Sequence, residues 1–403
     1  MKAIDRLVKY VGILTPSDEH SDTHPSNPDE FKLAHELVDE LKSLGVSDAF
    51  VDEHCYVYGH IPATPGKENA PAVGLIAHMD TVSDYCDHTP NVQIIENYDG
   101  NDVILGTSGR ILRVNDFPHL PKLKGRTLIT SDGTTILGSD DKSGIAEIMT
   151  AIEQIDSIPH GPVCVAFTPD EEIGRGTDDF RQDVFGANFA FTLDGEVEGE
   201  VQYESFNAAY AEVTFHGNNV HPGSAKDVMV NASLVAMEFN LMLPVAERPE
   251  YTEKYEGFFH LTSMSGSVEK AKLTYLLRDH DKNKFAAKKS TMELAAKHIN
   301  EKYGEGTVEL SIRDQYGNMA AALKDCPELM EIASKACKNC DVDPISVPIR
   351  GGTDGAVLSL QGLPCPNLGT GGFAFHGPYE HATVEGMDSM VRVILEILRL
   401  IAE

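Results

Sequence analysis

Three consecutive acids, Asp170, Glu171 and Glu172, follow an apolar run at residues 163–167. The run predicts a buried strand, and sites of α/β proteins form at the carboxyl ends of such strands. The repulsion between the acids has to be offset by solvent or by a divalent cation. In the second case one carboxylate binds the metal while its neighbour stays free to accept a proton. The stretch alone leaves both explanations open.

Other apolar runs of the chain also end in a carboxylate or an imidazole. The side chains concerned are His78 and Asp80, Asp140 and Asp141, Glu171 and Glu172, and Asp194, with His376 as a further candidate after a Gly-rich segment. Strands of one sheet would bring these ends to a common edge. Imidazole with carboxylate is a ligand set for Zn²⁺, Mn²⁺ or Co²⁺ and lacks the thiolates of a structural zinc site. The acids exceed the needs of one ion and suit two ions about 3.5–4 Å apart with a bridging carboxylate.

Composition limits the partners and the compartment. The 403 residues include 33 Lys plus Arg against 63 Asp plus Glu, a net charge of −30. Phosphate binding needs a basic face, so we expect no nucleic acid and no membrane as partner. We find no run of the roughly 20 apolar residues that span a bilayer, and no signal-peptide pattern. The seven scattered cysteines predict a reducing compartment, the cytoplasm, and Cys337 and Cys340 suit a helix end better than a zinc knuckle.

The periodicity of the chain predicts an α/β fold with two domains. Residues 1–206 and 319–403 alternate apolar runs with helical patterns, which is typical of a catalytic domain with a central, mostly parallel sheet flanked by helices. The intervening residues 207–318 predict the order βαββαβ, an inserted α+β sandwich. We therefore expect a discontinuous metal-binding domain and an inserted lid or dimerisation domain.

Several segments carry more specific expectations. The helix expected at residues 228–243 places Val230, Leu234, Met237 and Leu241 on one face. Residues 82–125 are expected to form an elaborated loop with hairpins and little core. Residues 127–137 predict two short strands about a turn, and residues 345–349 predict another strand.

Taken together, these motifs resemble the M20 family of di-zinc metallopeptidases, which includes glutamate carboxypeptidase and aminoacylase. The segments that carry the resemblance are HMDT (78–81), GSDDKSG (138–144), TPDEEIGRG (168–176), TLDGE (192–196), GNNVHPGSAKDVMVNA (217–232), RGGTDGA (350–356) and NLGTGG with HGPYE (367–380). They cover essentially the whole chain and are specific in their order and separations. Within the family, the chain is most similar to tripeptide aminopeptidases.

The resemblance implies a role for each motif residue. The implied metal ligands are His78 and Asp194 on one ion, Glu172 and His376 on the other, and Asp140 as the bridge. Asp80 is implied to orient the imidazole of His78, and Glu171 to be the general base. The family often has a cis peptide bond after the bridging aspartate.

Two histidines compete for the last ligand position. The family's histidine is followed four residues later by glutamate, and His376 with Glu380 fits this pattern. His381 has no such partner and occupies a place where an apolar or aromatic residue is expected. The pattern therefore favours His376.

Residues of the substrate site are implied in the inserted domain and near it. His221 would reach the site of the other subunit and hold the oxyanion, which implies a homodimer, although a turn histidine is the simpler explanation from the pattern alone. Asn218 or Asn219 would add a hydrogen bond to the substrate. Arg278 and Arg350 would hold its carboxylate or carbonyls, and a surface ion pair is the alternative for both.

The resemblance implies an aminopeptidase that releases the N-terminal residue of tripeptides, with two Zn²⁺ per subunit and Co²⁺ or Mn²⁺ as alternatives. A dipeptidase, carboxypeptidase or amide deacylase of the same family would share the metal core, so the pocket decides between them. The alternative outside enzymology is an acidic protein that binds Ca²⁺ without chemistry. Calcium prefers oxygen ligands, so His78 and His376 argue against it.

Overall fold

The computed structural model describes residues 1–106 and 108–403, and these divide into two compact units. The first unit comprises Met1–Tyr203, Ala322–Val347 and Thr353–Glu403, and the second comprises Glu204–Ala321 and Pro348–Gly352. The segment Pro348–Gly352, which we expected in the discontinuous domain, thus belongs to the second unit. Its Arg350 guanidinium donates hydrogen bonds to the carbonyls of Lys254 and Glu256, which explains the assignment.

A mixed sheet with the strand order β1-β2-β8-β3-β9-β15-β10 forms the centre of the first unit. Its strands are β1 (Phe50–Val51), β2 (Val57–Ile61), β3 (Val73–His78), β8 (Val163–Thr168), β9 (Phe189–Gly195), β10 (Val201–Gln202) and β15 (Asn367–Gly369). The strands β8, β3, β9 and β15 are parallel, and the outer strands pair antiparallel. Every residue of β3 and β8 is buried, which explains their continuous apolar runs.

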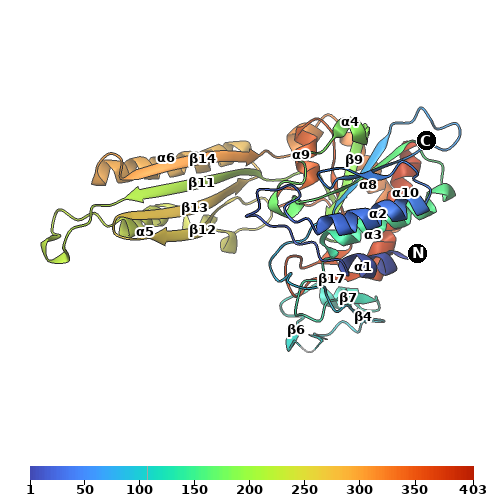
Figure 1. Ribbon diagram of the computed structural model, residues 1–403, viewed down its shortest axis with the longest axis horizontal. Helices are drawn as coiled ribbons and strands as arrows, with labels where there is room; N and C mark the ends of the chain where they lie inside the picture. The colour runs from blue at the N-terminus through green and yellow to red at the C-terminus, as the bar shows by residue number, and fades with distance from the viewer. Residues whose placement is uncertain (107) are drawn as a thin grey trace. The chain divides into compact units, whose positions relative to one another are not determined.

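Helices of the first unit pack against this sheet and against one another (Figure 1). They are α1 (Ala3–Val11), α2 (Glu30–Ser43), α3 (Ser139–Gln154), α4 (Gln182–Phe185), α8 (Pro327–Asn339), α9 (Asp354–Leu360) and α10 (Val384–Ile401), with the 3-10 turns η2 (Ile155–Ser157) and η3 (Glu171–Ile173). Helix α3 contacts β3, β9, α1 and α10. Helix α1, whose Leu7 and Tyr10 are fully buried, is not among the elements expected from the sequence. Cys337 lies in α8 and Cys340 caps it, which confirms the helix end expected for this pair.

Residues between β3 and α3 form a small core of their own. They contribute β4 (Gln93–Ile95), β7 (Leu128–Thr130), the hairpin of β5 (Val103–Leu105) and β6 (Arg110–Leu112), and η1 (Leu120–Leu123), and β16 (Gly372–Phe373) and β17 (His381–Thr383) complete the sheet β16-β17-β7-β4. The apolar side chains that they bury together include Tyr98, Leu105, Leu112, Leu120 and Phe373. The expectation of little core in residues 82–125 was therefore wrong for the described residues. The sequence did not indicate this core because its side chains are too widely spaced to form a period. Residue 107 lies outside the description.

Two expected strand regions differ from the structure. Of the pair expected at residues 127–137, only β7 forms among the described residues, and residues 131–137 turn toward the start of α3. Residues 345–349 contribute an isolated bridge between Ile345 and Glu200 rather than a strand. In both places the chain has the composition of a strand but no continuous neighbouring strand to pair with in the described structure.

The second unit is an antiparallel sheet with helices, in the chain order β11-α5-β12-β13-α6-β14. The bounds are β11 (Asn207–His216), α5 (Ala232–Met242), β12 (Phe258–Gly266), β13 (Lys270–Asp279), α6 (Lys282–Tyr303) and β14 (Val308–Tyr316), with η4 (Pro222–Ser224), η5 (Val245–Glu247) and η6 (Pro249–Tyr251). Helix α7 (Ala320–Leu323) includes the last residues of this stretch and the first residues of the next stretch of the first unit. This is the expected βαββαβ order, with the strands arranged as β12-β13-β11-β14 (Figure 1).

Helix α5 buries a different face from the one expected. Val235, Ala236 and Phe239 are buried, whereas Leu234, Met237 and Leu241 are 62%, 52% and 71% exposed. The helix is apolar on most of its circumference, so periodicity did not identify the side that packs on the sheet. The apolar residues Leu234, Met237 and Leu241 are called the α5 stripe below.

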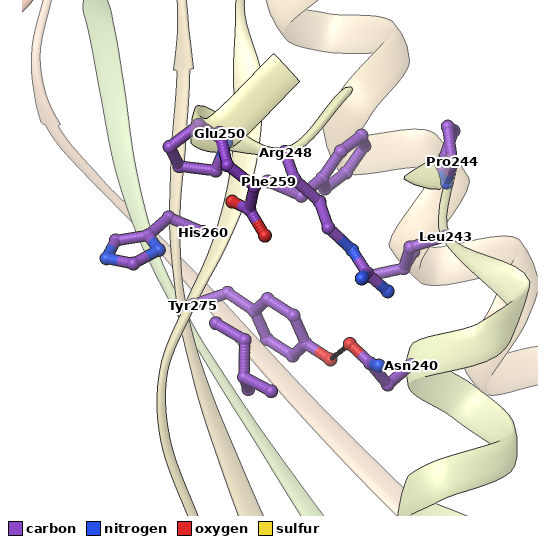
Figure 2. Close-up of a pocket in the computed structure, with 10 residues that line it drawn as sticks. Asn240, Leu243, Pro244, Arg248, Glu250, Phe259, His260 and Tyr275 are labelled. Atoms are coloured by element: carbon purple, nitrogen blue, oxygen red, sulfur yellow. Dashed lines mark hydrogen bonds between the residues drawn. The ribbon is translucent and has the colours of Figure 1, made fainter. Parts of the chain in front are cut away.

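A cavity of ≈ 250 Å³ lies in the second unit between the end of α5 and strands β12 and β13 (Figure 2). Its lining includes Arg248, Phe259 and Tyr275, and the Tyr275 hydroxyl donates to Oδ1 of Asn240 at 3.1 Å. In the described part of the chain, no helix has both the length and the apolarity needed to cross a membrane.

Candidate metal centre

The carboxyl ends of neighbouring strands bring the acidic and imidazole side chains of the first unit together. Strands β8, β3 and β9 are parallel neighbours, so His78, the turn after Thr168 and Asp194 lie at one edge of the sheet. Asp140 reaches the same edge from the first turn of α3. Gly144 allows this approach, because a Cβ there would lie 2.2 Å from the carbonyl oxygen of Leu193.

The turn after β8 distributes its three acids in different directions. Asp170, with a positive φ of 55°, and Gly174, with 72°, flank the 3-10 turn that carries Glu171 and Glu172. Asp170 is buried and its Oδ2 accepts the backbone N–H of Ser26 at 2.7 Å. This acid is therefore used by the fold, whereas Glu171 and Glu172 belong to the groups around His78.

His78 directs its Nε2 at acidic oxygens. Its Nδ1 donates to the backbone carbonyl of Asp80 at 3.0 Å, so Nε2 is the free ring nitrogen. Nε2 lies 3.1 Å from Oδ1 of Asp140 and 3.6 Å from Oδ1 of Asp194. A nitrogen lone pair and carboxylate oxygens repel one another unless a proton or a metal cation lies between them. This donor set therefore fits a metal ion.

His376 forms the second part of the cluster. Its Nε2 lies 3.0 Å from Oδ2 of Asp140 and 3.1 Å from Oε2 of Glu172. Asp140 thus faces one imidazole with each carboxylate oxygen, which is the arrangement of a bridging ligand. Among the described residues, Oε1 of Glu172 is buried without a hydrogen-bond partner, which leaves a site for a cation.

The electrostatics of the cluster also suit a cation. Burial raises the pKa of Glu172 to about 7 and, with the charge of Asp194, raises the pKa of Glu171 well above its usual range. Burial likewise raises the pKa of Asp194. For Asp140 burial acts in the same direction, but the two imidazoles outweigh it and lower the pKa. A bound divalent ion would offset the repulsion that these carboxylates share.

Two sets of side chains in this cluster have ligand atoms close enough to hold an ion. One set is His78, Asp140 and Glu172, and the other is His78, Glu171 and Asp194. The second set means that Glu171 is near enough to act either as a ligand or as the proton acceptor. The peptide bond between Asp140 and Asp141 is cis, as the resemblance implies.

Asp80 has a wider role than orienting His78. Its Oδ1 lies 3.4 Å from Nδ1 of His78, farther than its own carbonyl oxygen. The same carboxylate accepts the backbone N–H groups of Glu171 at 2.9 Å and Glu172 at 3.1 Å. Asp80 therefore also fixes the turn that carries both glutamates.

His381 lies in a different environment from His376. It is fully buried, its ring stacks on Phe373 and His119, and Nδ1 donates to the carbonyl of Tyr379 at 2.8 Å. Its Nε2 accepts from Nε2 of His119 at 2.9 Å. Burial lowers the pKa of His381 to about 4, which matches a neutral, packed imidazole.

The expected substrate residues lie in the second unit. His221 is exposed and its Nδ1 accepts the N–H of Gly223, while Asn218 donates to the carbonyl of Val228 and Asn219 is exposed. The roles proposed for these side chains rest on the resemblance alone.

Both expected substrate arginines have partners in the fold. Arg278 is buried, donates to the carbonyls of Ala209 and Leu277, and lies over the ring of Tyr316. Arg350 donates to backbone carbonyls and packs against the rings of Phe206 and Phe258. Among the described residues, neither arginine forms the surface ion pair that was the alternative explanation. Their role in substrate binding stays a prediction.

Buried carboxyl groups without a predicted role also lie near the cluster. Asp354 accepts the hydroxyl of Thr168 at 2.6 Å, and burial raises its pKa to about 7. Glu380 binds the segment that leads into Asp140. Both lie in motifs that carried the resemblance, but their partners are distant in the chain, so no local pattern identified them.

Residues 133–400 match the model of the peptidase family M20/M25/M40, and the chain belongs to this family. It is 51% identical over 406 residues to peptidase T of Clostridium acetobutylicum, covering 100% of this chain and 99% of the relative. Peptidase T of Bacillus velezensis is 50% identical over 404 residues, covering 99% of this chain and 98% of the relative. The fold is shared with a tripeptidase from Staphylococcus aureus, with a TM-score of 0.79 at 20% sequence identity. The superposition covers 100% of this chain and 98% of that chain.

These similarities confirm the resemblance to the M20 metallopeptidases and the predicted α/β fold with an inserted domain. The chain is a hydrolase of the peptidase class, and it contains residues arranged to bind metal.

Proposed function

We propose that this protein is a di-zinc aminopeptidase that releases the N-terminal residue of tripeptides. The observation that carries the proposal is the position of Asp140, whose two oxygens face His78 and His376 at 3.1 and 3.0 Å. His78, Asp140 and Asp194 would hold one ion, and Asp140, Glu172 and His376 the other. The peptidase T relatives and the tripeptidase fold support tripeptides as the substrate class.

Bound divalent ions would lower the pKa of water toward neutrality and polarise the scissile carbonyl. Glu171 takes the proton of the attacking water and returns it to the leaving amine. Asp80 keeps Glu171 in place through the backbone N–H of that residue. His221 would stabilise the developing oxyanion, as the resemblance implies.

The α5 stripe supports a homodimer formed through the second unit. Leu234, Met237 and Leu241 form one exposed apolar strip, and burying apolar surface against a second copy is favourable. Strand β12 has β13 as its neighbour in the described sheet and leaves its other edge open. The resemblance implies that such a dimer brings the His221 of one subunit to the site of the other.

The free thiols of the chain support a reducing compartment, the cytoplasm, as the place of action.

Metal content and product analysis test the proposal directly. We expect two transition-metal ions per chain, loss of tripeptide cleavage on chelation, and its return with Zn²⁺, Co²⁺ or Mn²⁺. A comparison of di-, tri- and tetrapeptides should give release of the first residue from tripeptides. Preferential cleavage of dipeptides, or release of the C-terminal residue, would favour another activity of the family. Binding of Ca²⁺ without any hydrolysis would contradict an enzyme.

A further inference from the structure

Glu380 binds the start of α3 although it lies 240 residues away in the chain. The side chain is 1% exposed. Its Oε2 accepts the backbone N–H groups of Leu137 and Gly138, each at 2.9 Å. Its Oε1 accepts the hydroxyl of Ser139 at 2.7 Å and the N–H of Asp140 at 3.0 Å. Both carboxylate oxygens are thus used by the four residues that end in Asp140.

This carboxylate binds the entry into α3, where Asp140 and Asp141 depart from helical backbone angles. The first N–H groups of a helix have no partner within the helix, and a side-chain oxygen of the preceding residue usually accepts them. The residue before α3 is Gly138, which has no side chain for this purpose and adopts a positive φ of 76°. A negative charge is also favourable at a helix N-terminus. Glu380 therefore binds, from another part of the chain, the N–H groups of an entry that Gly138 has no side chain to bind.

The position of Glu380 is itself fixed by its neighbours. His381 belongs to β17, which pairs with β7, and its ring is stacked against Phe373 and His119. Its Nδ1 donates to the carbonyl of Tyr379, the residue before Glu380. The stacked imidazole therefore holds the backbone on both sides of the carboxylate.

The orientation of Asp140 depends on this contact. Asp140 can face His78 with one oxygen and His376 with the other only if its backbone is held in one position. The bonds from Glu380 to the preceding N–H groups and to the N–H of Asp140 itself fix that backbone. We propose that Glu380 is a positioning residue that presents both oxygens of Asp140 to the metal centre. The inference rests on the metal centre proposed above.

The test compares Glu380→Gln with a matched glutamate elsewhere. Glu385 accepts the N–H and the hydroxyl of Thr127, at 2.8 and 3.2 Å, and lies in the first turn of α10. Glu385→Gln therefore weakens a carboxylate that binds a backbone N–H and a hydroxyl, at an exposed position with no bond to the segment of Asp140. Ser139→Ala removes one of the bonds to Glu380 and leaves the carboxylate intact.

Metal binding is measured on the full-length protein after removal of metal, without substrate. Zn²⁺ affinity comes from competition with a chelating dye, and the geometry of the site from the visible absorption of the Co²⁺-loaded protein. We expect Glu380→Gln to lower Zn²⁺ affinity roughly 10–100-fold and to change the Co²⁺ spectrum, as is typical for partners of metal ligands. Ser139→Ala should lower affinity in the same direction but less. Glu385→Gln should leave affinity and spectrum unchanged.

The outcome of these metal-binding measurements distinguishes a positioning role of Glu380 from a purely structural one. If Glu380→Gln is folded by circular dichroism and has wild-type affinity and spectrum, Glu380 is only a structural cap and the inference is wrong. If that variant does not fold, Ser139→Ala decides, and an unchanged affinity and spectrum in it would overturn the inference. If the wild-type protein binds neither Zn²⁺ nor Co²⁺, the metal centre itself is wrong and the inference fails with it. The peptide specificity does not affect these measurements.

Discussion

Oδ1 of Asp80 accepts the backbone N–H of Glu171 at 2.9 Å and so connects the end of β3 to the turn after β8. The residue that follows His78 by two positions therefore fixes the group proposed as the general base. A hydrogen bond to a charged acceptor contributes about 1.5–3 kcal/mol, enough to keep this turn in one conformation. The spacing of His78 and Asp80 is thus important for both the ligand and the base.

Glu171→Gln removes the proton acceptor while keeping the size of the side chain. We expect kcat for tripeptides to fall by about 10²–10⁴-fold because proton transfer is lost, with metal content unchanged by mass spectrometry. Glu385→Gln, outside the cluster, serves as the control and should keep wild-type turnover. Near-normal activity would remove Glu171 as the base. Loss of one metal equivalent would instead make Glu171 a ligand, as the set with His78 and Asp194 permits.

His376→Ala and His381→Ala should have opposite effects on metal and on stability. His376 is half exposed and faces Asp140 and Glu172, so its loss should lower metal content without opening a cavity in a packed core. His381 is buried in an aromatic stack, so its truncation should lower the melting temperature of the metal-free protein by creating a cavity, at a cost of roughly 2–4 kcal/mol. The folded His381 variant should retain its metal. The reverse pattern would exchange the two assignments.

Leu241→Glu places a charge in the α5 stripe. If the stripe lies between two copies of the chain, we expect a monomer by light scattering that binds metal but turns over tripeptides poorly. Ile104→Glu, at a 68% exposed apolar position in the first unit, is the matched control and should stay dimeric. A monomeric wild-type protein with full activity would rule out the role of the dimer.

Glu40 should make stability depend on pH through its contacts with Lys9 and Arg6. Burial raises the pKa of Glu40, but the hydrogen bonds from the two cations outweigh it, and the pKa lies below its usual value. Such a group stabilises the folded state above its unfolded pKa, and the contribution is lost as pH falls through the folded pKa. Glu40→Gln should therefore cost on the order of 3 kcal/mol at pH 7, and the difference from wild type should shrink below about pH 4.

Urea denaturation at pH 7, 5 and 3 measures this effect. Glu36→Gln is the control, because Glu36 also pairs with Lys9 but its side chain is 41% exposed. It should change stability by less than about 1 kcal/mol at any of these pH values. A constant difference between Glu40→Gln and wild type from pH 7 to pH 3 would contradict the assignment.

Much of the fold and of the cluster followed from local patterns. The buried strands β3 and β8 were predictable because each is a continuous apolar run. The site residues at their ends were predictable because they directly follow these runs in the sequence. The βαββαβ order was predictable because strand-like and helical segments alternate along this part of the chain.

What could not be predicted depends on contacts between distant segments. The partners of Glu380, Arg278 and Arg350 are largely backbone groups, which carry no signature in the sequence. The side of α5 that packs on the sheet was not identifiable because apolar residues surround the helix. For His376 and His381, five positions apart in one motif, only the folded chain separates an imidazole beside carboxylates from one in an aromatic stack.

Asp170, the first of the three adjacent acids, binds Ser26, which lies 144 residues earlier in the chain. Thr15 similarly donates its hydroxyl to the carbonyl of Met79, next to His78. These two hydrogen bonds connect the loop before α2 to the ends of β3 and β8, which are followed by the residues of the metal cluster. Sequence changes in residues 15–26 should consequently alter hydrolysis even though none of these side chains belongs to the metal cluster.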